Sequence, residues 1–164
     1  MAIPSKSRIA ILAGAKKVVA EVGSYESNMI DIADRAEVSR ATIYNHFVDK
    51  EEMMKTLLAS EVDRLLNGAK SQQSKVAVLS FLSQEISSDT ALAKMVETDH
   101  DEIVALMMIS DDPLWIYIHR ELATLFQAGE SEVGLIIRWL LAQITSPLTP
   151  EQSQIQATAL ARLL

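Results

Sequence analysis

Residues 27–50 read SNMIDIADRAEVSRATIYNHFVDK, and this stretch decides the fold that we predict for the chain. Its first part predicts a short helix, because apolar residues recur at spacings of three and four and therefore share one helical face. They are Met29, Ile32, Ala33 and Ala36. Either Ser27 or Asn28 is placed to cap this helix with a side-chain oxygen. The pattern then breaks at residues 37–39, which is typical of a tight turn between two helices.

The second helix of this stretch is predicted from Arg40 to Phe47, with Ser39 as its cap. Ile43 and Phe47 share one face and are expected to pack inward. The other sides carry a cation, a hydroxyl, an aromatic ring and an amide, on Arg40, Thr42, Tyr44 and Asn45. Such groups bind base edges and phosphates in the major groove of DNA. We therefore interpret the stretch as a helix-turn-helix whose second helix reads DNA.

The run DIADRAEVSRATIYNHFVDKEEM (31–53) resembles the DNA-binding signature of the tetracycline-repressor (TetR) family of bacterial transcription regulators. The resemblance extends from about Arg8 to about Leu58. One departure is Glu37, which stands where the family usually has a glycine, so that either Glu37 takes a left-handed conformation or the turn differs. The matching residues are Asp31-Ile32-Ala33, Ala36, Val38-Ser39, Thr42-Ile43-Tyr44, His46-Phe47 and Lys50-Glu51.

Composition favours an all-α protein, because 49% of the 164 residues are hydrophobic while only five are Gly and four are Pro. The chain has no cysteine, which excludes disulfides and thiolate chemistry. Its net charge of −7 at first argues against DNA binding. However, residues 1–50 carry seven Lys/Arg against six Asp/Glu, and the acidity lies in the rest of the chain. A DNA-binding face needs local cations rather than a basic protein.

The predicted architecture is a three-helix helix-turn-helix head joined by a long helix to a C-terminal helical bundle. Residues 1–48 form the DNA-binding domain, with a loose arm over residues 1–6 and a first helix from Ser7 to about Val22. Residues 49–164 form the ligand-binding and dimerisation domain, which begins with the long helix from Asp49 to about Gly68. Further helices are expected at about 75–86, 89–96, 101–109, 113–127, 131–145 and 150–164, with no strands.

Residue type suggests roles for the polar groups of the head. Base-edge contacts are expected from Ser39, Arg40, Thr42 and Asn45, with Arg40 suited to guanine and Asn45 to adenine. Phosphate contacts are expected from Ser27, Tyr44, His46 and Lys50. For Tyr44 and His46 the alternative is packing within the head. Lys6 and Arg8 are either further phosphate contacts or solvated surface cations.

The last two predicted helices, at about 131–145 and 150–164, both carry apolar stripes. The resemblance implies that they pair with their copies in a homodimer, which would place two reading helices one DNA turn apart on a palindromic operator. The alternative is that the stripes close the core of one protomer. The stripes are Val133, Ile136, Ile137, Leu140, Leu141 and Ile144 in the first helix, and Ile155, Ala159 and Leu163 in the second.

The resemblance also implies a pocket for a small-molecule effector inside the bundle. We therefore predict a ligand-responsive repressor that binds a DNA operator as a dimer and is released when ligand shifts the long helix. The alternative function is a helical dimeric interaction or small-molecule-binding module without specific DNA recognition. Candidate ligand contacts, for which ordinary core packing is the alternative, are Met107, Met108, Trp115, Tyr117, His119 and Phe126.

An enzyme is not predicted, and neither is a metal or cofactor. Glu97-x-x-His100 matches half of a carboxylate di-iron pattern, but no second copy follows. The adjacent Asp99, His100 and Asp101 do not share one helix face. No targeting segment is evident, and the longest apolar run, Ile103 to Ile109, is too short to span a bilayer. A cytoplasmic protein without a membrane partner is therefore expected.

Overall fold

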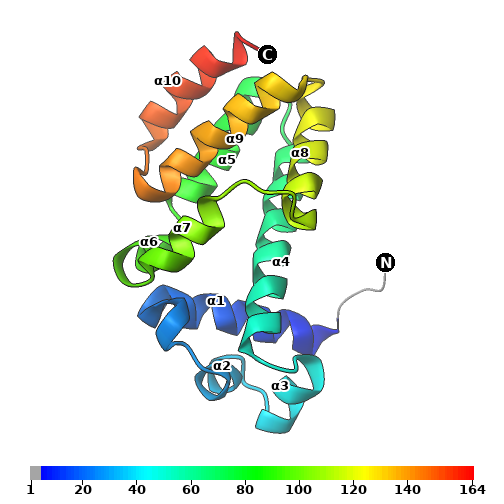
Figure 1. Ribbon diagram of the computed structural model, residues 1–164, viewed down its shortest axis with the longest axis vertical. Helices are drawn as coiled ribbons and strands as arrows, with labels where there is room; N and C mark the ends of the chain where they lie inside the picture. The colour runs from blue at the N-terminus through cyan, green and yellow to red at the C-terminus, as the bar shows by residue number, and fades with distance from the viewer. Residues whose placement is uncertain (1–4) are drawn as a thin grey trace. The chain divides into compact units, whose positions relative to one another are not determined.

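The computed structural model describes residues 5–164, which form α-helices joined by short loops and contain no strand (Figure 1). The all-α prediction is therefore confirmed. In chain order the helices are α1 (Lys6–Glu26), α2 (Met29–Arg35), α3 (Arg40–His46), α4 (Lys50–Lys70), α5 (Lys75–Ser87), α6 (Thr90–Thr98), α7 (His100–Met107), α8 (Pro113–Phe126), α9 (Glu130–Thr145) and α10 (Pro150–Ala161).

Several predicted helix boundaries were wrong for identifiable reasons. The arm predicted over residues 1–6 lies mostly outside the described residues, but Ser5 already caps α1 by accepting a hydrogen bond from the Arg8 amide at 3.2 Å. Gly68 does not end α4. Instead it leaves room for a ring, since a Cβ there would lie 2.3 Å from the Phe81 ring. The last helix ends at Ala161 rather than at the final residue.

The chain divides into two compact units, and the boundary between them cuts through α4. The head unit comprises residues 1–61 and 90–103, and the bundle unit comprises residues 62–89 and 104–164. The head unit therefore includes α6 and the start of α7 as well as the expected N-terminal helices. The functional boundary predicted between residues 48 and 49 stays a prediction.

The core of the head unit is built from α1, α2, α3 and the start of α4. Its fully buried side chains include Ile11, Ile32, Ile43 and Met53. Gly14 lets α1 approach the end of α2 closely, because a Cβ there would lie 3.0 Å from the Ala36 Cβ.

Local signals in the sequence set the ends of α2 and α3. Asn28, rather than Ser27, caps α2 and accepts from the amides of Ile30 and Asp31, both at 3.0 Å. Ser39 caps α3, as predicted, by accepting from the Thr42 amide at 3.1 Å. Between them Glu37 has a φ of 55°, so the left-handed alternative for the turn is confirmed.

The core of the bundle unit is apolar except for one buried polar cluster. Ser83 donates to the Gln143 side-chain oxygen at 2.5 Å and lies 2.7 Å from the Ser153 hydroxyl. This cluster joins α5, α9 and α10, and each member has a partner, as buried polar groups require. Further hydrogen bonds hold α10, from Ser80 to Gln154 and from the Trp139 indole to Gln156, both at 2.8 Å.

Replacing Glu37 by glycine is expected to raise the free energy of unfolding by up to about 1 kcal/mol. A left-handed residue with a Cβ costs about 1–2 kcal/mol, and the greater entropy of glycine in the unfolded chain offsets part of that gain. Asp34→Gly, inside α2, is the control and should lower the free energy of unfolding by about 1 kcal/mol. Denaturant unfolding measures both. Equal destabilisation by the two variants would contradict a strained turn.

Candidate nucleic-acid interface

The reading helix α3 buries one face and exposes the other. Ile43 and Phe47, at 0% and 1% exposure, fix the helix and its C-cap on the head core. Opposite them Arg40, Tyr44 and Asn45 are exposed, with Tyr44 at 55%. The helix is seven residues long, so these three side chains cover most of its outer surface.

The hydroxyls at the start of α3 bond to each other and to the helix backbone. Ser39 Oγ and Thr42 Oγ1 lie 2.8 Å apart, and Ser39 Oγ also accepts from the Thr42 amide. Ser39 is exposed and Thr42 is partly buried. Base contacts by these hydroxyls stay predictions, but the structure already gives both of them a role at the helix start.

The C-terminal end of α3 is held by Arg8 of α1. The Arg8 guanidinium lies 4.3 Å from the centroid of the Phe47 ring and donates to the His46 carbonyl at 3.0 Å. It also donates to the Thr56 hydroxyl of α4 at 3.5 Å. A cation at this end of a helix is favoured by the helix dipole and by the free carbonyls of the last turn. Arg8 therefore fixes α3 between α1 and α4, a role that sequence spacing did not reveal.

Two of the four predicted phosphate contacts bond to the protein backbone. Ser27 is 3% exposed, and its hydroxyl donates to the Ser24 carbonyl at 2.6 Å. Lys50 donates to the carbonyls of Ser24, Tyr25 and Ser27 at 3.0, 2.9 and 3.1 Å. An ammonium has three donors, and all three are used here. His46 is half-buried, whereas Tyr44 is exposed.

Three exposed residues near α3 were missed by the sequence reasoning. Ala41 is exposed beside Arg40, one turn before Tyr44 and Asn45, and a methyl group there suits contact with thymine. Its position at helical spacing from Tyr44 was the available signal. Val48 and Tyr25, at 81% and 73% exposure, flank the helix-turn-helix, and no pattern in the sequence marks them.

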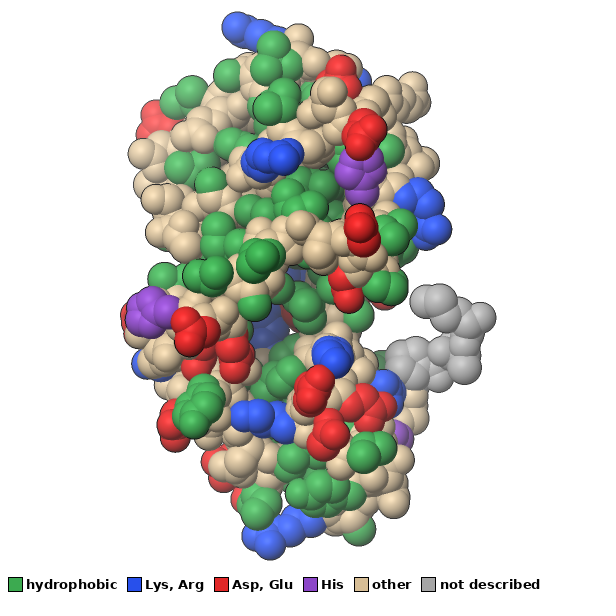
Figure 2. Space-filling model, viewed as in Figure 1, with side chains coloured by type: hydrophobic (Ala, Val, Ile, Leu, Met, Phe, Trp, Pro, Cys, Tyr) green, Lys and Arg blue, Asp and Glu red, His purple; other side chains and the backbone are tan. Residues whose placement is uncertain are grey.

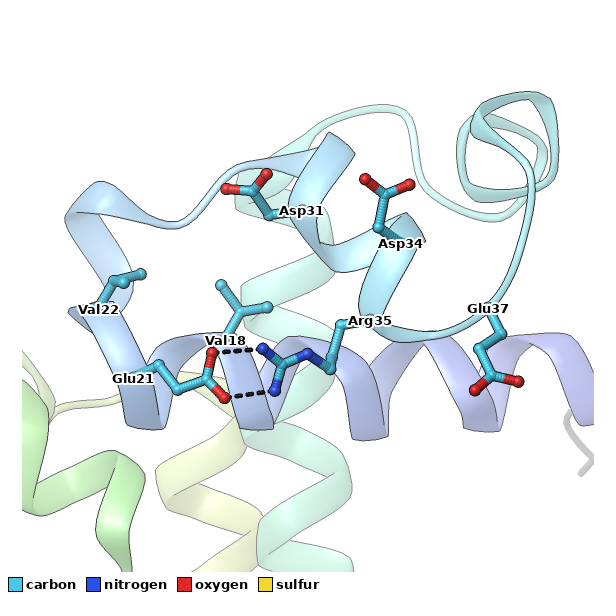
Figure 3. A pocket seen from close by; sticks show the side chains of 7 residues that line it. All are labelled: Val18, Glu21, Val22, Asp31, Asp34, Arg35 and Glu37. Carbon is cyan, nitrogen blue, oxygen red and sulfur yellow. Dashed lines mark hydrogen bonds and ion pairs between the residues drawn. The ribbon is translucent and has the colours of Figure 1, made fainter.

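One side of the head unit is acidic and hollowed (Figure 3). Arg35 of α2 faces Glu21 of α1 and makes two hydrogen bonds to its carboxylate, the second at 2.6 Å. These hydrogen bonds and the charge of Glu21 raise the pKa of the Arg35 guanidinium. The remaining charges of the hollow are carboxylates, which would repel the phosphates of DNA. Its lining residues are Val18, Glu21, Val22, Asp31, Asp34, Arg35 and Glu37.

The head unit also matches known proteins in sequence. Residues 11–57 fit the family model described as bacterial regulatory proteins, tetR family. This match covers the helix-turn-helix and the start of α4, and it relates the head of the chain to the DNA-binding domain of that family. Over 60 residues it is 37% identical to the HTH-type transcriptional activator FasR of Mycolicibacterium smegmatis, a match that covers 37% of this chain and 27% of FasR.

Solved TetR-type structures share the fold over nearly the whole chain. The fatty acid degradation regulator FadR of Bacillus halodurans matches with a TM-score of 0.66 and 15% identity, covering 99% of this chain and 96% of that protein. The TetR family repressor AlkX of Dietzia sp. matches with a TM-score of 0.63 and 16% identity, covering 95% and 94%. At these identities the likeness establishes the fold.

In the bundle unit the predicted ligand residues have different surroundings. Phe126 is fully buried in the core, and Trp115 and Tyr117 pack partly buried against the same core. Met107 and His119 are half-buried, whereas Met108 is 66% exposed. A hollow on the bundle unit lies at α10, lined by Gln154, Ile155, Thr158, Ala159 and Arg162, and includes none of them.

Tyr117 is the most constrained of these candidates. Its hydroxyl donates to Asp63 of α4 at 2.9 Å, and the Arg120 guanidinium lies 5.5 Å from its ring centroid. The hydrogen bond to Asp63, with burial and nearby carboxylates, raises the pKa of Tyr117 above its usual 10.0. The Tyr117–Asp63 bond thus ties α8 to the long helix.

Two negative observations apply to residues 5–164. No group of three or more His, Cys, Asp or Glu side chains in this range is arranged to hold a metal ion. The Asp99 carboxylate accepts from backbone amides of the head. Over the same residues no helix has the length and apolar character needed to cross a membrane.

The Tyr117 phenol should ionise above the usual tyrosine pKa of 10.0, and Asp63→Asn should lower its pKa. A raised pKa in the folded state means that the stabilising contribution is present below the unfolded value of 10.0 and is lost as the pH rises through the folded value. Tyrosinate absorbance in an alkaline titration measures this, with Tyr117→Phe identifying the late component. Identical titrations of the wild-type and Asp63→Asn proteins would contradict the hydrogen bond.

Proposed function

We propose that this protein is a TetR-family regulator that represses transcription by binding a palindromic DNA operator as a homodimer, and that a small apolar effector releases it. The observation that carries the proposal is the exposed polar face of α3, which buried Ile43 and Phe47 hold outward. Repression of this kind needs occupancy of the operator and no chemical step.

Within α3 the exposed side chains divide the work of recognition. Arg40 is assigned to a guanine edge and Asn45 to an adenine edge, because each offers bidentate geometry to that base. Tyr44 and His46 are assigned to phosphates, which set the register of the helix in the groove. Ser39 and Thr42 support these contacts from the start of the helix.

The dimer is assigned to the outer face of α9 and α10. Most of the apolar stripe predicted on α9 packs into the core of the bundle unit, where Val133, Ile136 and Ile137 are buried. The stripe predicted for the last helix is instead exposed: Ile155 of α10 is 62% exposed, and Leu163, which follows the end of α10, is 65% exposed. On the face of the bundle unit seen in Figure 2, hydrophobic side chains are frequent and lie among uncharged surface with scattered Lys, Arg, Asp, Glu and His side chains. An apolar stripe on the last helix is suited to a second copy of the chain.

The effector is assigned to the region around Tyr117. A ligand with an apolar body and a polar group can pack against Trp115 and compete with Asp63 for the Tyr117 hydroxyl. Asp63 lies on α4, and the N-terminal part of the same helix belongs to the head unit. A change at the Tyr117–Asp63 bond therefore acts on a helix that also forms part of the head. The description of FadR as a fatty acid degradation regulator, and of AlkX as implicated in the biodegradation of n-alkanes, supports an apolar ligand.

Operator binding should be lost when α3 loses its base contacts. The probe is duplex DNA from upstream of the protein's own coding sequence, with a scrambled duplex as competitor. Arg40→Ala and Asn45→Ala should each weaken binding by about 1–3 kcal/mol for the native duplex. Lys70→Ala, at an exposed lysine at the end of α4 and outside both proposed interfaces, is the control and should leave affinity unchanged. Equal, weak binding of both duplexes by all the proteins would favour the module without DNA recognition.

Dimerisation should fail when a charge enters the α10 stripe. Ile155→Asp places a carboxylate where two apolar faces meet, and the protein should sediment as a monomer with weakened operator binding. Ile116→Asp on α8 is the matched control, because Ile116 is 58% exposed in the same unit. Analytical ultracentrifugation measures both. A dimer that persists in Ile155→Asp would remove α10 from the interface.

A further inference from the structure

Residues 24–27, the junction segment between the break in α1 at Gly23 and the start of α2, are bonded through both their amides and their carbonyls. Gly23 has a φ of 88°, which turns the backbone away from the helix path. The next amides point to one side and the carbonyls to another. Each side meets a charged group from a distant part of the head unit.

The amides of the junction segment bind the carboxylate of Asp99. Ser24 N donates to Asp99 Oδ2 at 2.7 Å, and Tyr25 N donates to Oδ1 at 3.1 Å. Asp99 is 6% exposed and lies between α6 and α7. Successive amides after a residue of positive φ form an anion-binding nest. Here the nest is filled by the chain's own carboxylate.

Gly23 allows this approach. A Cβ at Gly23 would lie 2.4 Å from Thr98 Oγ1 and 2.5 Å from Asp99 Oδ2, too close for either atom. Thr98 also donates to Asp99 Oδ2 at 3.1 Å, which holds the carboxylate in place. The packing of α6 on α1 therefore depends on a residue without a side chain.

The carbonyls of the same segment bind the ammonium of Lys50. Lys50 is the first residue of α4 and uses all three of its donors on Ser24, Tyr25 and Ser27. A carboxylate on the amides and an ammonium on the carbonyls each match the partial charges of the peptide groups they meet. Together they tie the α6–α7 corner and the start of α4 to the junction segment, which directly precedes the Asn28 cap of α2.

We propose that Asp99 and Lys50 are positioning residues for operator binding, which hold the junction segment between them and so set the angle at which α2 and α3 are presented. The proposal rests on the proposed function, since it concerns the presentation of α3. It gives Lys50 a task inside the protein in place of a phosphate contact. It also gives a negative charge, Asp99, a favourable effect on DNA binding.

Two measurements separate a positioning role from direct contact with DNA. They are the direction in which a substitution changes the affinity and the dependence of the affinity on salt. Loss of a phosphate contact reduces the slope of log affinity against log salt concentration by about 0.9. Loss of a positioning residue lowers affinity and leaves that slope unchanged. Removal of a negative charge strengthens DNA binding if only long-range charge matters, so a weaker complex after Asp99→Asn requires positioning.

The test compares Lys50→Met and Asp99→Asn with Lys17→Met, which removes a charge from an exposed site of α1. Affinity for the native upstream duplex is measured over a range of salt, at a temperature where circular dichroism shows every variant folded. Lys50→Met and Asp99→Asn should each lose about tenfold or more in affinity with the wild-type slope. Lys17→Met should lose less. A reduced slope in Lys50→Met, or tighter binding by Asp99→Asn, would overturn the proposal.

Two further measurements keep the proposal testable on its own. The Lys50→Met, Asp99→Asn double variant should bind DNA about as tightly as whichever single variant binds more weakly, because both residues hold one segment. Fully additive losses of binding free energy would refute that coupling. Amide hydrogen exchange needs no DNA. In either single variant the amides of α2 and α3 should exchange about tenfold faster while those of α9 stay unchanged. Unchanged exchange in α2 would sink the positioning role, whereas faster exchange without any operator binding would fault only the proposed function.

Discussion

The burial of Ile43 and Phe47 is the constraint on which the head depends. A helix of seven residues is not stable alone in water, so α3 exists because one face is fixed against α1 and α2. The same burial decides which side chains remain outside. Caps by Asn28 and Ser39 define where the two short helices begin, and Arg8 binds the carbonyl end of α3. A polar surface for DNA is therefore a by-product of apolar packing beneath it.

The charges of the head show why composition is a poor guide to its chemistry. Several cations that a count of Lys and Arg would assign to DNA are bonded within the protein, including Arg8, Arg35 and Lys50. Their partners are carbonyls, a carboxylate and an aromatic ring, all placed by the fold. The near-neutral net charge of residues 1–50 therefore adds together charges that are bonded within the protein and charges that are exposed. In the proposed function the exposed Arg40 acts through its location on α3, which a count of charges does not reveal.

Local sequence rules predicted the helix-turn-helix well, because its caps, spacing and turn lie within a few residues of one another. The Thr149 capping box at α10 was predictable for the same reason. The roles of Arg8 and Lys50 were not, since their carbonyl partners lie 38 and 23 to 26 residues away along the chain. The glycine at position 68 suggested a helix end. Its actual role, making room for Phe81 of another helix, depends on a contact that local sequence does not show. The grouping of α6 with the head likewise depends on tertiary contacts around Gly23 that no periodicity encodes.

The polar cluster beneath α10 has a consequence for symmetry. Within α10 only Ser153 and Ala157 are buried, and Leu160 and Ala161 pack partly buried against the core, so the apolar contact area of this helix is small. Its attachment relies on hydrogen bonds from Ser153, Gln154 and Gln156. Hydrophobic contacts tolerate rotation about a helix axis, whereas hydrogen bonds have preferred directions. These hydrogen bonds therefore fix the rotation of α10 about its own axis. In the proposed dimer, a two-fold axis passing beside this helix would take its orientation from hydrogen bonds made within one protomer.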